Sequence, residues 1–134
     1  MFLTALEDFD YKPCYKDGEL VRGKVVTQST LVWRRDMFSD VAVPAGFVTD
    51  LASLPWFTSL LFKKLGKSQR AAVLHDYLYK HRVDSKTWAD RQFLEAMRID
   101  GVKRWRRNSM WLAVSVFGFY AWNRNKKSEV EIVE

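Results

Sequence analysis

Hydrophobic and polar residues alternate over the first third of the chain, and the pattern turns helical from about Pro55 onward. Asp17-Gly18 is a two-residue hairpin signal, and Pro44-Ala45-Gly46 is typical of a turn. The flanking runs are rich in β-branched and aromatic residues, which favour strands. We therefore expect three or four antiparallel strands, at 9–15, 20–26, 29–33 and 41–43.

The rest of the chain predicts about four helices, because serine or aspartate precedes several of the periodic segments and glycine follows them. Ser53, Ser68 and either Asp84 or Ser85 are the expected N-caps. The helices are expected at 55–65, 69–81, 85–100 and 102–122. A short link at 82–86 should make the second and third helices an antiparallel pair.

The fold class is therefore α+β, with a small antiparallel N-terminal sheet followed by helices. We expect a single domain over residues 1–122 and a polar, flexible tail over 123–134.

Acidic and imidazole groups stand on the apolar faces of the two central helices. His75 aligns with Ala71 and Tyr79, Asp76 lies next to it, and Asp90 borders the stripe that contains Phe93. An acid on such a stripe needs a partner, because burying it unpaired is costly. We expect Asp90 to accept a hydrogen bond from His75, with the Tyr79 hydroxyl nearby, which would leave the other imidazole nitrogen as a base.

The segment 46–55 is expected to be a loop that carries several oxygen atoms to a helix N-terminus. Thr49 and Ser53 could cap the helix or bind an anionic ligand there. Asp50 could anchor His75 or act as a metal ligand. The sequence leaves the capping and ligand-binding alternatives open.

The composition limits the cellular compartments in which we expect the protein. Cys14 is the single cysteine, which excludes an intrachain disulfide and a cysteine-based zinc site and fits a reducing compartment. The N-terminus does not resemble a signal peptide. The apolar run 110–122 is shorter than the roughly 20 residues of a spanning helix, so we expect it to be a buried core helix.

The net charge of +6 is concentrated late in the chain, in Lys103, Arg104, Arg106 and Arg107 around Trp105. This cluster could bind the phosphates of nucleic acid or of anionic lipids, or it could be a solvated turn between helices.

Four motifs together resemble the domain of unknown function 1353, a family found in bacteriophages and prophages. They are VPAGFVTDLASLP at 43–55, HDYLY at 75–79, ADRQFLEAM at 89–97 and GVKRWRR at 101–107. The resemblance covers about residues 40–122. It implies a viral origin and a compact α+β domain, without an established activity. Because we expect neither a signal peptide nor a spanning helix, a viral origin implies a protein of the host cytoplasm or of a virion.

A second resemblance concerns chemistry. His75-Asp76-x-x-Tyr79 followed by Ala89-Asp90-x-x-Phe93 is similar to the paired helices of phospholipases A(2), particularly those of parvovirus capsids. The resemblance implies that His75 activates water, Asp76 binds calcium, Asp90 orients His75 and Tyr79 supports them by a hydrogen bond. The glycine-rich calcium loop of that family is not found in the segment before His75, where Asp50 could act as a carboxylate ligand instead.

These observations favour a non-enzymatic phage protein, either a virion component or a module that acts on the host. The alternative is a phospholipase-like hydrolase of ester or phosphoester bonds, with or without a metal. A third interpretation is a module that binds anionic surfaces through Lys103–Arg107.

Overall fold

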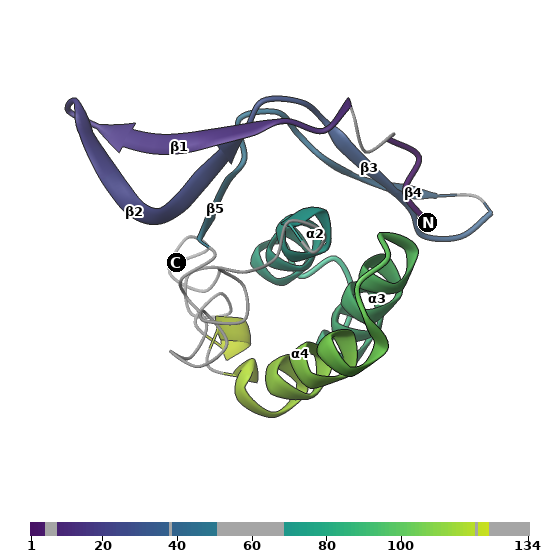
Figure 1. Ribbon diagram of the computed structural model, residues 1–134. Helices are drawn as coiled ribbons and strands as arrows, with labels where there is room; N and C mark the ends of the chain where they lie inside the picture. The colour runs from purple at the N-terminus through teal and green to yellow at the C-terminus, as the bar shows by residue number, and fades with distance from the viewer. Residues whose placement is uncertain (5–7, 38, 51–68, 120, 124–134) are drawn as a thin grey trace, which may run out of the picture.

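The computed structural model describes residues 1–4, 8–37, 39–50, 69–119 and 121–123 of the chain (Figure 1). Its strands are β1 (Tyr11–Lys16), β2 (Glu19–Thr27), β3 (Leu31–Arg34), β4 (Asp40–Val43) and β5 (Val48–Asp50). Its helices are α2 (Gln69–Lys80), α3 (Lys86–Ile99) and α4 (Arg104–Phe117). Strands precede helices along the chain, which confirms the α+β class. The expected helix at 55–65 and most of the expected tail, 124–134, lie outside the described residues.

The first hairpin forms where the sequence predicts it. Asp17 and Gly18 have φ angles of 54° and 82°, and a two-residue turn of this kind requires positive φ at both positions. Strands β1 and β2 pair antiparallel on either side, with Lys16 opposite Glu19.

The strands form two small sheets, in the order β1-β2-β5 and β3-β4. Residues 48–50 were expected in a loop, and this expectation is wrong, because Val25 pairs with Thr49 and Val26 with Val48. One edge of β2 pairs with β1, and the backbone donors and acceptors on its other edge pair with β5.

The second sheet also binds the N-terminus and a helix. The amide of Leu3 donates to the carbonyl of Val32 at 2.9 Å, so the first residues run beside β3. The Trp33 indole nitrogen donates to Gln92 on α3 at 2.9 Å, and its ring meets Phe2 edge-on. Trp33 thereby joins β3, the N-terminus and α3.

The strands lie across one side of the molecule, and α2 lies between them and the pair α3 and α4 (Figure 1). Helix α2 contacts β3, β5 and α3, while α3 also packs on α4. The expected cap of α3 is present, since the Ser85 hydroxyl accepts from the amide of Trp88. The largest fully buried apolar side chains come from both layers: Leu31, Trp33, Val43, Val73, Leu74, Leu78, Phe93, Met97, Met110 and Val114.

Within the described part of the chain, none of the helices has the length and apolar character needed to cross a membrane.

Candidate functional site

A buried imidazole–carboxylate pair joins the two central helices. His75 on α2 lies 2.8 Å, Nε2 to Oδ1, from Asp90 on α3, and both residues are at most 6% exposed. The link between the helices is short, so the chain reverses and places the two positions opposite each other. The contact expected from the helical pattern is present. The imidazole ring lies between Tyr79 and Phe93, with centroids 4.2 and 4.6 Å away.

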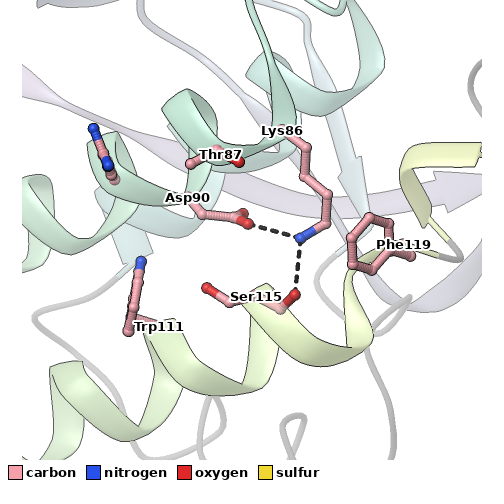
Figure 2. A pocket seen from close by; sticks show the side chains of 7 residues that line it. Lys86, Thr87, Asp90, Trp111, Ser115 and Phe119 are labelled. Carbon is pink, nitrogen blue, oxygen red and sulfur yellow. Dashed lines mark hydrogen bonds and ion pairs between the residues drawn. The ribbon is translucent and has the colours of Figure 1, made fainter.

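Two further donors complete the coordination of Asp90. The Tyr79 hydroxyl donates to Oδ1 at 2.6 Å, and the Lys86 ammonium donates to Oδ2 at 2.8 Å. Lys86 also donates to the backbone carbonyls of Val114 at 3.1 Å and Ser115 at 3.2 Å (Figure 2). We call His75, Tyr79, Lys86 and Asp90 the Asp90 network. It connects α2 to α3 through the Asp90 carboxylate, and α3 to α4 through the Lys86 ammonium.

The network determines the charge of its own members. Burial would raise the pKa of the Asp90 carboxyl, but the hydrogen bond and charge of His75, with the hydrogen bonds from Lys86 and Tyr79, hold this pKa below its usual range. Burial, and next the hydrogen bond to Asp90, raise the pKa of the Tyr79 hydroxyl well above its usual value. Asp90 is therefore ionised and Tyr79 is neutral at physiological pH.

An ionised carboxylate only accepts hydrogen bonds, so the Nε2 nitrogen of His75 must carry a proton. In the neutral imidazole, Nδ1 then holds the lone pair. The tautomer is thus the one that a general base requires, although His75 itself is buried.

Stability should fall in acid because of Asp90. Its pKa is lower in the folded than in the unfolded chain, so its contribution is complete above the unfolded value of 3.8 and is lost as the pH falls through the folded value. We expect the melting temperature of the wild type to drop more steeply below about pH 4 than that of Asp90→Asn, as measured by circular dichroism. Parallel curves for the two proteins would contradict this assignment.

A pocket of about 240 Å³ opens between α3 and α4, on the Lys86 side of the network (Figure 2). It is lined by Lys86, Thr87, Asp90, Arg91, Trp111, Ser115 and Phe119. Figure 2 shows the Lys86 ammonium between Asp90 and Ser115, beside the Phe119 ring. His75 is not among the lining residues. This pocket therefore gives access to Lys86 and Asp90, and does not give access to the imidazole.

The structure describes the side chain of one of the two predicted metal ligands, Asp76. Asp76 is half-buried and pairs with Lys80 one helical turn away, at 3.3 Å. In the described ranges of the chain, there is no group of three or more His, Cys, Asp or Glu side chains that could hold a metal ion. The side chain of Asp50 and all of Ser53 lie outside the described residues. The described donors thus do not fit the calcium site that the phospholipase resemblance implies.

Thr49 lies on β5, and its place in a loop is corrected accordingly. The side chain is fully buried, and within the described structure its hydroxyl oxygen has no hydrogen-bond partner. The capping of the helix expected at 55–65 stays a prediction, because that segment lies outside the described residues.

The basic cluster forms the start of α4. Lys103 and Arg104 are exposed, and the indole of Trp105 is 60% exposed. Arg106 stacks over Trp105 at 5.5 Å, whereas Arg107 donates to the carbonyl of Val102 at 3.2 Å. The sequence left open a phosphate-binding surface and a solvated turn. The structure places exposed cations next to an arginine that closes the helix start.

Lys86 was missed at the sequence level because it stood at the end of the expected link. Its spacing of four residues from Asp90 was a usable signal, since such pairs face each other on a helix. Gly118 was missed too, and no local signal identifies it. A β-carbon there would lie 2.6 Å from the Tyr79 hydroxyl, so only glycine lets α4 end against the network.

Comparison with known proteins gives one match. The family described as "Protein of unknown function (DUF1353)" matches residues 25–114, which is more than half of the chain. No curated protein matches the chain. No solved structure matches it either.

Proposed function

The chain belongs to the DUF1353 family, and from this premise we propose that it is a non-enzymatic bacteriophage protein, a virion component or a module that binds a host partner. In this proposal the Asp90 network is architectural. The observation that carries it is the number of side chains bound to Asp90, whose two oxygens accept from three donors on two helices. The bacteriophage origin is supported by the motifs at 43–55, 75–79, 89–97 and 101–107.

The contacts of Lys86 support an architectural role. Its ammonium has three protons and three acceptors, namely Asp90 and the carbonyls of Val114 and Ser115. No proton of Lys86 is left for a substrate in the pocket. Because these carbonyls belong to α4, the bonds attach this helix to α3 and fix which face of α4 is turned outward.

The burial of His75 also supports this role. A general base must come within hydrogen-bond reach of the proton that it removes, directly or through a water molecule. The imidazole is 6% exposed and packed between two aromatic rings. Such surroundings suit a buried hydrogen-bond network that stabilises a single arrangement of the helices.

The test compares the two histidines of the chain. We expect His75→Ala to lower the free energy of unfolding by about 1–3 kcal/mol, because it leaves Asp90 with one donor fewer inside the protein. His81→Ala, at the exposed histidine, should change it far less. Both are measured by thermal unfolding and by turnover of a chromogenic ester, a phospholipid and a cyclic nucleotide. Turnover by the wild type that disappears in His75→Ala and persists in His81→Ala would overturn the proposal.

A phospholipase-like hydrolase is the second candidate, and the specific observation in its favour is the geometry of Asp90 Oδ1. This oxygen accepts from both His75 and Tyr79, which are the roles that the resemblance implies for these residues. His75 Nδ1 would take a proton from water as its oxygen attacks the ester carbonyl, and the proton would pass to the departing alkoxide. Activity that depends on His75 and Asp90, assayed with and without calcium, would establish this function.

A further inference from the structure

Large apolar side chains gather on the outer face of α4. Trp105, Leu112, Val116 and Phe119 are each more than half exposed. Their spacings of seven, four and three residues place them along one side of the helix and its continuation. The opposite side of α4 carries the buried residues Met110, Ala113 and Val114. We call the four exposed residues the α4 face.

Leu112, Val116 and Phe119 follow one another along this side, whereas the exposed Asn108 and Ser109 separate Trp105 from Leu112. Contiguous apolar patches on soluble proteins mark sites of interaction with proteins, membranes or ligands. The α4 face is also held in place, because the Phe119 ring lies 4.4 Å from the Lys86 ammonium, which is itself bonded to Val114 and Ser115 of α4. The face is therefore presented by a helix that the Asp90 network attaches to the rest of the fold.

The charges beside the α4 face select the chemistry of the partner. Helix α4 contains three arginines and no acidic residue, and Lys103 precedes it. Lys103 and Arg104 are exposed next to Trp105. A row of Trp, Leu, Val and Phe with cations beside it matches a helix that lies in the interface of a bilayer with anionic head groups. Tryptophan is itself enriched at that depth.

Nucleic acid fits these observations less well. Phosphates would contact Lys103 and Arg104, but they would leave Leu112, Val116 and Phe119 exposed to water. A bilayer can bind both the cations and the apolar side chains, because the cations contact the head groups while the apolar side chains enter the layer below them.

We propose that the α4 face, together with Lys103 and Arg104, docks this protein onto the surface of an anionic phospholipid bilayer. This inference goes beyond the proposed function, because it concerns another surface and does not depend on any role of His75. It also names the bilayer as a partner, whereas the architectural role of the Asp90 network does not identify any partner.

The experiment uses the full chain and two kinds of vesicles, pure phosphatidylcholine and an equimolar mixture with phosphatidylglycerol, in a sedimentation assay. The wild type should bind the mixed vesicles more strongly, and added salt should weaken that binding. The double variant Leu112→Ser/Val116→Ser should lower the partition coefficient at least about tenfold, because two apolar side chains no longer enter the interface. Arg104→Gln should lower it about fivefold on mixed vesicles only.

Leu20→Ser is the matched control, since Leu20 lies on β2 and is 55% exposed, against 57% for Leu112. It should bind as the wild type does. The proposal would be overturned if the wild type bound neither kind of vesicle, or bound both equally at all salt concentrations. This result is obtained with the wild type alone, so it does not depend on whether the variants fold. A dimer in solution that Leu112→Ser disrupts, without binding to vesicles, would overturn it in favour of a second copy of the chain. Loss of vesicle binding in the double variant, with Leu20→Ser unaffected, would support it.

Discussion

Replacing Asp90 with alanine is expected to lower the free energy of unfolding by about 3–5 kcal/mol, the usual cost of breaking a buried ion pair. The side chains of Lys86 and Asp90 are 9% and 4% exposed, so the variant leaves an ammonium group inside the protein without its counterion. The imidazole of His75 and the hydroxyl of Tyr79 lose the same acceptor. Chemical denaturation followed by circular dichroism measures the effect.

Two comparisons separate the buried charge from a general effect of mutation. Lys86→Met combined with Asp90→Leu should be less destabilising than Asp90→Ala alone, because no charge is left uncompensated. Glu95→Ala removes another acid from α3, one whose partner Arg98 is on the surface, and should change stability little. If Asp90→Ala were as mild as Glu95→Ala, the Asp90 network would not hold the helices together.

Replacing Arg70 with methionine should destabilise the fold by a similar amount, about 3–5 kcal/mol. Arg70 at the start of α2 makes two hydrogen bonds to Asp100, at the end of α3, and donates to the carbonyl of Thr4 at 2.7 Å. Its guanidinium also lies 4.0 Å from the ring of Phe2. The Asp100 side chain is 3% exposed, so its carboxylate would stay buried without a cation.

The control for Arg70 is a variant that keeps the charge. Arg70→Lys should recover only part of the lost stability, because an ammonium group cannot make the two-pronged contact with Asp100 and the bond to Thr4 together. Arg98 is paired with Glu95 on the surface, so Arg98→Met should hardly change the free energy of unfolding in the same assay. Full recovery by lysine would show that charge alone matters at this position.

The sequence by itself determined the features that depend on neighbours along the chain. Asp17-Gly18 predicts its hairpin because few residue pairs tolerate positive φ at both positions. Ser85 predicts the start of α3 because its hydroxyl reaches an amide three residues later. The contact of His75 with Asp90 follows from two local features. Helical spacing puts each residue on the apolar face of its helix, and the short link turns these two faces toward each other.

Only the tertiary structure decided the features that join distant segments. Strand β5 pairs with β2 across more than twenty residues, and no local pattern distinguishes such a strand from a loop. Lys86 is buried because the carbonyls of Val114 and Ser115, 28 and 29 residues further on, meet its ammonium. Arg70 finds Asp100 in the same way, 30 residues away.

The outward position of Leu112, Val116 and Phe119 was also decided by the tertiary structure. The sequence shows an apolar run at 110–122 and favours a buried helix, since most apolar helices are covered by the rest of the fold. The buried side chains of α4 are Met110, Ala113 and Val114, and the fold leaves Leu112 and Val116 exposed. Which side of an apolar helix is covered depends on the neighbours that the fold supplies, and the order of residues along the helix does not contain that information.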